Sequence, residues 1–85
     1  MKMTRTELRE ACADIDFETV STVFTNTLEV NDGDATIGSL VFIDGKVQLN
    51  FARHIDLESR RAKQLAYLCH KHNGTLVYDA VLLEG

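Results

Sequence analysis

Hydrophobic residues recur at helical spacing near the start of the chain and then alternate with polar ones through its middle. Leu8 and Cys12 lie one helical turn apart, which places both side chains on one face of a helix. Thr4 and Glu7 precede them with the spacing of a capping box, in which the two residues satisfy each other's backbone N–H groups. This pattern predicts a helix over about residues 5–13.

The middle of the chain has the β-branched composition and the alternation of β-strands. Residues 19–30 predict one half-buried strand, and "NDGD" at residues 31–34 predicts the turn that ends it. The segments "ATIGSLVFI" and "KVQLNFAR" predict two further strands, because "DG" between them is typical of a two-residue hairpin. Four apolar residues of the first strand are expected on one side of it: Val20, Phe24, Leu28 and Val30.

A second helix and a last β segment complete the expected fold. The helix should cover about residues 57–72, with Asp56 as its N-cap and Asn73-Gly74 as a left-handed end. The segment "TLVYDAVLLE" that follows predicts another strand. The order α-β-β-β-α-β indicates a single α+β domain over residues 1–85, with a largely antiparallel four-stranded sheet packed with two helices.

Two of the predicted strands, "ATIGSLVFI" and "TLVYDAVLL", are apolar on both faces. Two short helices do not cover both faces of a sheet, and an exposed apolar face favours association with a second copy. We therefore expect a homodimer, formed through the open sheet face or the edge of the last strand.

The composition is that of an ordinary globular domain: 45% of the 85 residues are hydrophobic and 26% are charged. No apolar run approaches the roughly 18–20 residues that span a bilayer, and "MKMTRTELRE" is too polar for a signal peptide. We therefore expect a cytoplasmic protein. Its two cysteines, Cys12 and Cys69, both fall on apolar helix positions and are expected to be buried thiols.

The stretch "CHKH" at residues 69–72 groups types of side chain that bind zinc. On a helix Cys69 and His72 face the core side, whereas His70 points toward the side that carries Lys63. At most two ligands converge, so we expect no metal site. The chain also has no glycine-rich phosphate loop and no "GxSxG" motif, and we assign no catalytic residues and no cofactor.

A basic face is expected on the second helix, with tyrosine at its centre. Such a face can contact phosphates, and an aromatic ring can stack on a base. The order α-β-β-β-α, with "SRRAKQLAYL" opening the last helix, resembles the double-stranded RNA-binding domain, whose last helix begins with a similar basic cluster. The resemblance implies an RNA-binding module with Arg60, Arg61 and Lys63 on phosphates. The complete candidate face consists of Arg60, Arg61, Lys63, Tyr67 and Lys71.

The charges of the chain are divided along the sequence. Residues 10–45 hold eight acidic side chains and no Lys or Arg, whereas residues 46–71 hold six basic side chains against two acidic ones. A one-sided acidic surface would steer a basic partner, although carboxylates also occupy turns and helix caps for purely structural reasons. The candidate partner-binding residues are Asp14, Asp16, Glu18, Glu29, Asp32, Asp34 and Asp44.

These features favour a non-enzymatic interaction protein that binds and inhibits or modulates a protein with a basic, nucleic-acid-binding groove. A small acidic domain without proline is similar in type to the inhibitors that phages and mobile elements make against host nucleic-acid machines, including anti-CRISPR proteins. The RNA-binding module is the alternative, with the second helix as its functional surface.

Overall fold

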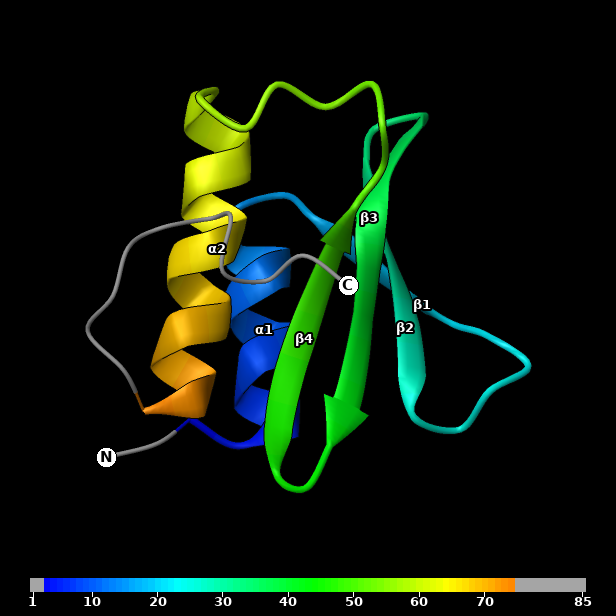
Figure 1. The fold of residues 1–85 in the computed structure, drawn as a ribbon, viewed down its shortest axis with the longest axis vertical. Helices are drawn as coiled ribbons and strands as arrows, with labels where there is room; N and C mark the ends of the chain where they lie inside the picture. Colours follow the sequence, from blue (N-terminus) through cyan, green and yellow to red (C-terminus); the bar gives the residue numbers. More distant parts are fainter. Residues whose placement is uncertain (1–2, 75–85) are drawn as a thin grey trace.

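The computed structural model describes residues 3–74, in which a four-stranded meander lies between two helices in the sequence (Figure 1). The predicted fold class is confirmed: the chain forms an α+β domain with an antiparallel four-stranded sheet and two packed helices. The strand predicted over residues 75–84 lies outside the described residues. The elements are α1 (Arg5–Asp14), β1 (Glu18–Ser21), β2 (Thr27–Asp32), β3 (Ala35–Ile43), β4 (Lys46–Phe51) and α2 (Arg60–Asn73).

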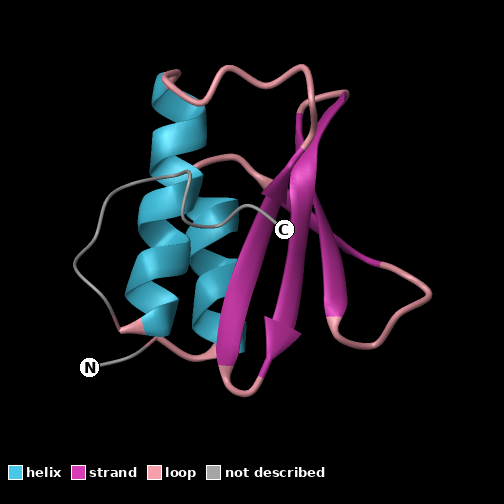
Figure 2. Ribbon diagram, in the orientation of Figure 1, coloured by secondary structure: helices cyan, strands magenta, loops and turns pink. Residues whose placement is uncertain are grey.

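The sheet has the order β1-β2-β3-β4, and each strand pairs antiparallel with its neighbour in sequence. Both helices lie on the same face of the sheet, so the domain has one helix layer and one strand layer (Figure 2). The hairpins follow the predicted turn chemistry, with left-handed φ values of 64° at Gly33 and 77° at Gly45. No helix of the described residues is long and apolar enough to cross a membrane.

The single strand predicted over residues 19–30 is wrong, because the structure forms two strands there with a loop at residues 22–26. The loop reverses the chain, and Val20 pairs with Glu29 on the side of the sheet away from Leu28. Val20 and Phe24 are consequently exposed, whereas Leu28 and Val30 are buried as predicted. Side chains alternate between the two faces of a sheet only along a continuous strand. The loop at residues 22–26 interrupts this alternation.

Local hydrogen bonds determine where the two helices begin and end. At α1 the predicted capping box is present: the Glu7 N–H donates to Thr4 Oγ1 at 3.1 Å and the Thr4 N–H donates to Glu7 Oε1 at 2.8 Å. Hydrogen bonds to the Glu7 carboxylate from the Thr4 backbone N–H and, secondly, from the Thr4 side chain hold the pKa of Glu7 below its usual value.

At α2 the predicted N-cap is wrong. Ser59 caps the helix by accepting from the Ala62 N–H, whereas the Asp56 carboxylate accepts from the Glu58 N–H in the preceding turn. The Asp56 carboxylate is used for a hydrogen bond within the turn before α2 and does not cap the helix. The helix therefore starts one turn later than predicted. The left-handed end at Gly74 is confirmed, with φ 77°.

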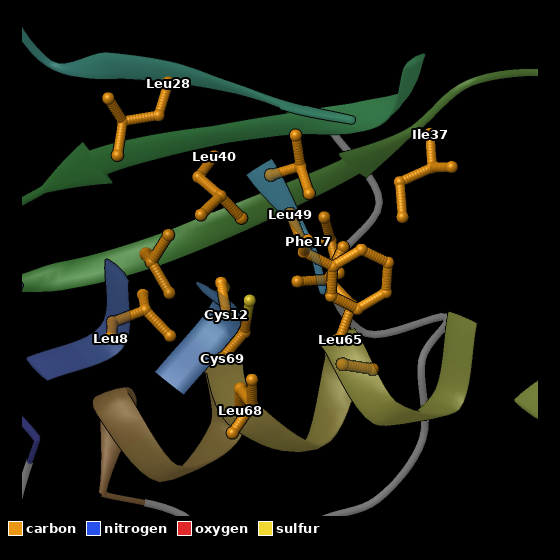
Figure 3. Close-up of a cluster of buried hydrophobic side chains, with 13 residues drawn as sticks. Leu8, Cys12, Phe17, Leu28, Ile37, Leu40, Leu49, Leu65, Leu68 and Cys69 are labelled. Atoms are coloured by element: carbon orange, nitrogen blue, oxygen red, sulfur yellow. The ribbon is translucent and has the colours of Figure 1, made fainter. Parts of the chain in front are cut away.

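One hydrophobic core fills the space between the sheet and the helices (Figure 3). The strands contribute leucines from their inner face, and each helix contributes one apolar stripe. The largest fully buried side chains of the core are Phe17, Leu8, Leu28, Leu40, Leu49, Leu65, Val30, Cys12 and Cys69.

Cys12 of α1 and Cys69 of α2 are buried free thiols, as predicted, and lie near each other in the core (Figure 3). Burial raises the pKa of Cys12 to about 11. The pKa of Cys69 is also raised, mainly by burial and further by the neighbouring Cys12. Both thiols therefore stay protonated in the folded state at pH values where thiols of the unfolded chain ionise.

We expect the folded state to lose stability above about pH 9, close to the ordinary thiol pKa. Between this pH and the higher folded pKa values, the unfolded chain releases protons that the folded chain retains, so a rise in pH favours unfolding. The urea midpoint should therefore fall from pH 8 to pH 10. In the Cys12→Ala/Cys69→Ala variant the fall should be smaller, and equal falls in the two proteins would show that the thiols do not cause it.

Candidate protein interface on the open sheet face

The face of the sheet opposite the helices, here called the outer face, is not covered by any helix or strand of residues 3–74. The register aligns its side chains in rows across the strands, with Glu29 between Val20 and Ser39, and Val41 between Thr27 and Gln48. The residues of the outer face are Glu18, Val20, Thr27, Glu29, Asn31, Ser39, Val41, Ile43, Lys46, Gln48 and Asn50.

The predicted acidic residues do not form one continuous surface. Glu18 and Glu29 lie on the outer face, and Asp34 and Asp44 lie exposed in the two hairpin turns at its ends. The nine residues of β3 separate these turns, at about 3.3 Å per residue. Four of the seven carboxylates therefore line or border the outer face.

The other three carboxylates lie near one end of the sheet. Asp14 and Asp16 are exposed where α1 leads into β1, and Asp16 takes a left-handed φ of 67° in that turn. Asp32 points toward the helix layer and forms an ion pair with Arg61, with 3.1 Å between the Asp32 Oδ1 and Arg61 Nη2 atoms.

Arg61 connects α2 to the end of the sheet. Its Nε also donates to Asp32 Oδ2 at 3.2 Å, and its Nη1 donates to Gln64 Oε1 at 3.1 Å. The guanidinium carbon lies 3.9 Å from the centre of the Phe17 ring. Two-point pairing with a carboxylate and packing on a ring are oriented contacts, so they fix the Arg61 side chain between Asp32 and Phe17.

The other four residues of the predicted basic face, Arg60, Lys63, Tyr67 and Lys71, are exposed on one side of α2. Lys63 Nζ lies 3.3 Å from the Glu58 carboxylate, and Lys71 Nζ lies 5.4 Å from the centre of the Tyr67 ring. The spacing of these residues thus gives an exposed stripe, as predicted, whereas Arg61 is turned toward Phe17.

Three of the four residues of the "CHKH" stretch are buried, and Lys71 is exposed. Cys69 and His72 face the core side as predicted, and His72 packs edge-on against Phe42 with 5.6 Å between ring centres. His70, expected on the side that carries Lys63, is also buried. No group of three or more potential metal ligands is found among residues 3–74.

The loop between β1 and β2, residues 22–26, is a surface that the sequence did not reveal. It extends away from the helix layer in Figure 1. It carries Val23, which is 91% exposed, and Phe24, which is 65% exposed. At the same end of the sheet the outer face carries Ile43, which is 51% exposed, and Val20, which is 37% exposed. Here the term loop-end patch denotes Val20, Val23, Phe24, Val41 and Ile43.

Hydrogen bonds fix the course of this loop. Thr22 Oγ1 accepts from the Phe24 N–H at 3.1 Å and lies 3.1 Å from the Thr27 carbonyl oxygen, to which its hydroxyl can donate. The Thr27 N–H donates to the Phe24 carbonyl at 3.2 Å. Arg5 of α1 donates to the Thr25 carbonyl at 3.3 Å and packs over the Phe42 ring, with 4.3 Å between the guanidinium carbon and the ring centre. None of these bonds involves the Val23 or Phe24 side chains.

The topology differs from the α-β-β-β-α order on which the resemblance to the double-stranded RNA-binding domain rested, because four strands separate the two helices. Comparisons with protein-family models, curated proteins and solved structures find no significant match to this chain.

Proposed function

We propose that the chain is a non-enzymatic interaction protein whose outer face binds the basic, nucleic-acid-binding surface of another protein and inhibits or modulates it. The observation that carries this proposal is a sheet face that no helix or strand of residues 3–74 covers, with carboxylates on it and exposed apolar side chains at one end. An exposed apolar surface with a polar border is typical of protein-binding sites.

The charges of the outer face favour a basic partner. Glu18 and Glu29 on the face, with Asp34 and Asp44 in the adjoining turns, give four carboxylates against the single ammonium group of Lys46. A negative potential attracts a positively charged partner during diffusion and disfavours nucleic acid itself. The surface of a protein that normally holds phosphates has the complementary charge.

The first experiment identifies the partner. The tagged chain is used to capture proteins from its native host, and the captured protein is identified by mass spectrometry and purified. We expect a protein that binds DNA or RNA, and we expect nucleic acid and the chain to compete for it. Capture of no protein, or of one whose binding does not compete with nucleic acid, would contradict the proposal.

Charge reversal on the outer face then tests the role of the carboxylates. In Glu29→Lys/Asp34→Lys the association rate with the purified partner should fall at least about tenfold at low ionic strength, because charge steering changes association rates by this order. The salt dependence of the rate should also become flatter. The measurement is stopped-flow association at two ionic strengths.

The matched control is Arg60→Glu/Lys63→Glu on the exposed stripe of α2, which should leave the association rate equal or raise it. The opposite ranking, with loss of binding only in the α2 variant, would favour the RNA-binding alternative. Binding of duplex RNA by the unmodified chain, lost in the α2 variant, would establish that alternative instead.

A further inference from the structure

We propose that Phe24, with Val23 beside it, is the anchor of this interface, and that the β1–β2 loop inserts both side chains into an apolar pocket bordered by Lys or Arg residues of the partner. This inference rests on the proposed function and specifies the partner chemistry. The partner surface that contacts the loop-end patch is thus a protein cleft with an apolar centre and a basic border.

The two side chains of the proposed anchor are exposed in the free chain. Val23 is 91% and Phe24 is 65% exposed, and they are consecutive in the loop at residues 22–26, which extends away from the helix layer (Figure 1). Moving a large apolar side chain from water into a pocket contributes more favourable free energy than moving a small one. Aromatic residues are also enriched among those that dominate binding energy.

The loop that carries these side chains is preorganised. The loop backbone is bonded to the Thr22 hydroxyl, to the Arg5 guanidinium and to Thr27, so the two apolar side chains are presented on an ordered backbone. A loop already held in its bound conformation loses less entropy on binding. The chain thus exposes two apolar residues on a segment that its own hydrogen bonds keep in place.

The charges beside the loop-end patch select the partner. Glu29 lies beside Val20 in the same cross-strand row, and Asp44 follows Ile43 directly in the hairpin, where Lys46 is the cross-strand partner of Ile43. Carboxylates at these positions border the loop-end patch and match Lys or Arg residues around the entrance of a pocket. They oppose docking on an anionic membrane or on nucleic acid, whose phosphates carry the same sign.

The test measures binding of the purified partner, identified as above, to Val23→Ser and Phe24→Ser variants by surface plasmon resonance. We expect Phe24→Ser to raise the Kd at least about 30-fold, through faster dissociation with an association rate unchanged within about threefold. Val23→Ser should raise it by a smaller factor. The fold should be unaffected, as judged by an unchanged urea midpoint, because both side chains are exposed.

Three further variants test whether Phe24 acts as a specific anchor and whether the loop must be held in place. Tyr67→Ser removes an exposed aromatic residue from α2, and it should leave the Kd unchanged. Thr22→Val removes the hydroxyl that holds the loop and should raise the Kd, whereas Thr22→Ser, which keeps the hydroxyl, should restore it. A positioning role for Thr22 predicts this rescue.

The outcomes separate the two proposals. If the wild-type chain binds the partner in competition with nucleic acid but Phe24→Ser binds equally well, the loop inference is wrong and the proposed function stands. If no such partner exists, both are wrong. If Phe24→Ser instead abolishes self-association of the chain without affecting partner binding, the loop contacts a second copy and the inference is also wrong.

Discussion

Phe17→Ala is expected to destabilise the domain by about 3–5 kcal/mol, the range for a buried phenylalanine replaced by alanine. Phe17 is 2% exposed and belongs to the core, and its ring also carries the Arg61 guanidinium at 3.9 Å. The substitution leaves a cavity and removes the surface on which Arg61 packs while it pairs with Asp32. Urea unfolding measures the effect, against a total stability on the order of 5–10 kcal/mol for a small domain.

The control for this prediction is Phe17→Leu, which keeps most of the side-chain volume. It should cost less than about 1.5 kcal/mol, because an apolar replacement of similar size leaves no large cavity. Equal losses from the two substitutions would show that the ring contact with Arg61, rather than the volume of the core, determines the stability at this position.

Leu65→Ala is expected to cost about 2–5 kcal/mol, because Leu65 is fully buried between α2 and the sheet (Figure 3). Its neighbour Lys63 provides the comparison: Lys63→Ala removes an exposed side chain and its ion pair with Glu58, which contributes at most about 1 kcal/mol. Thermal melts of both variants measure the difference. A Leu65→Ala variant with the stability of Lys63→Ala would contradict the assignment of this α2 face to the core.

The helices and hairpins could be predicted because short local patterns determine them. Thr4 and Glu7 form a capping box across three residues, and Gly45 and Gly74 take left-handed conformations that their turn and helix end require. Burial of Cys12 and Cys69 followed from helical spacing alone. In each case the cause lies within a few residues of the effect.

The loop at residues 22–26 could not be predicted from the same patterns. "STVFTNT" is rich in β-branched and aromatic residues, whose preference for strands concealed the turn. Within this loop the Thr22 hydroxyl bonds to the backbone of Phe24 and Thr27. Threonine offers this bond in many strands without forming a turn, so its presence in the sequence does not distinguish the two outcomes.

The acidic surface was predicted from the run of carboxylates along the sequence, and the fold places these carboxylates on different parts of the molecule. Asp32 is drawn into an ion pair with Arg61, a residue 29 positions away in the sequence. The same contact withdraws Arg61 from the predicted basic face. A pairing over this separation depends on the packing of α2 against the end of the sheet, which sequence spacing does not reveal.

The most direct test of the proposed interface is NMR cross-saturation of the isotope-labelled chain by its unlabelled partner, which identifies the residues in contact. We predict the strongest loss of signal at Val23 and Phe24, with smaller losses at Val20, Val41 and Ile43. Signals of Arg60, Lys63 and Lys71 should be unaffected. Losses confined to these α2 residues, with Val23 and Phe24 unchanged, would contradict the assignment of the outer face and its loop as the partner-binding surface.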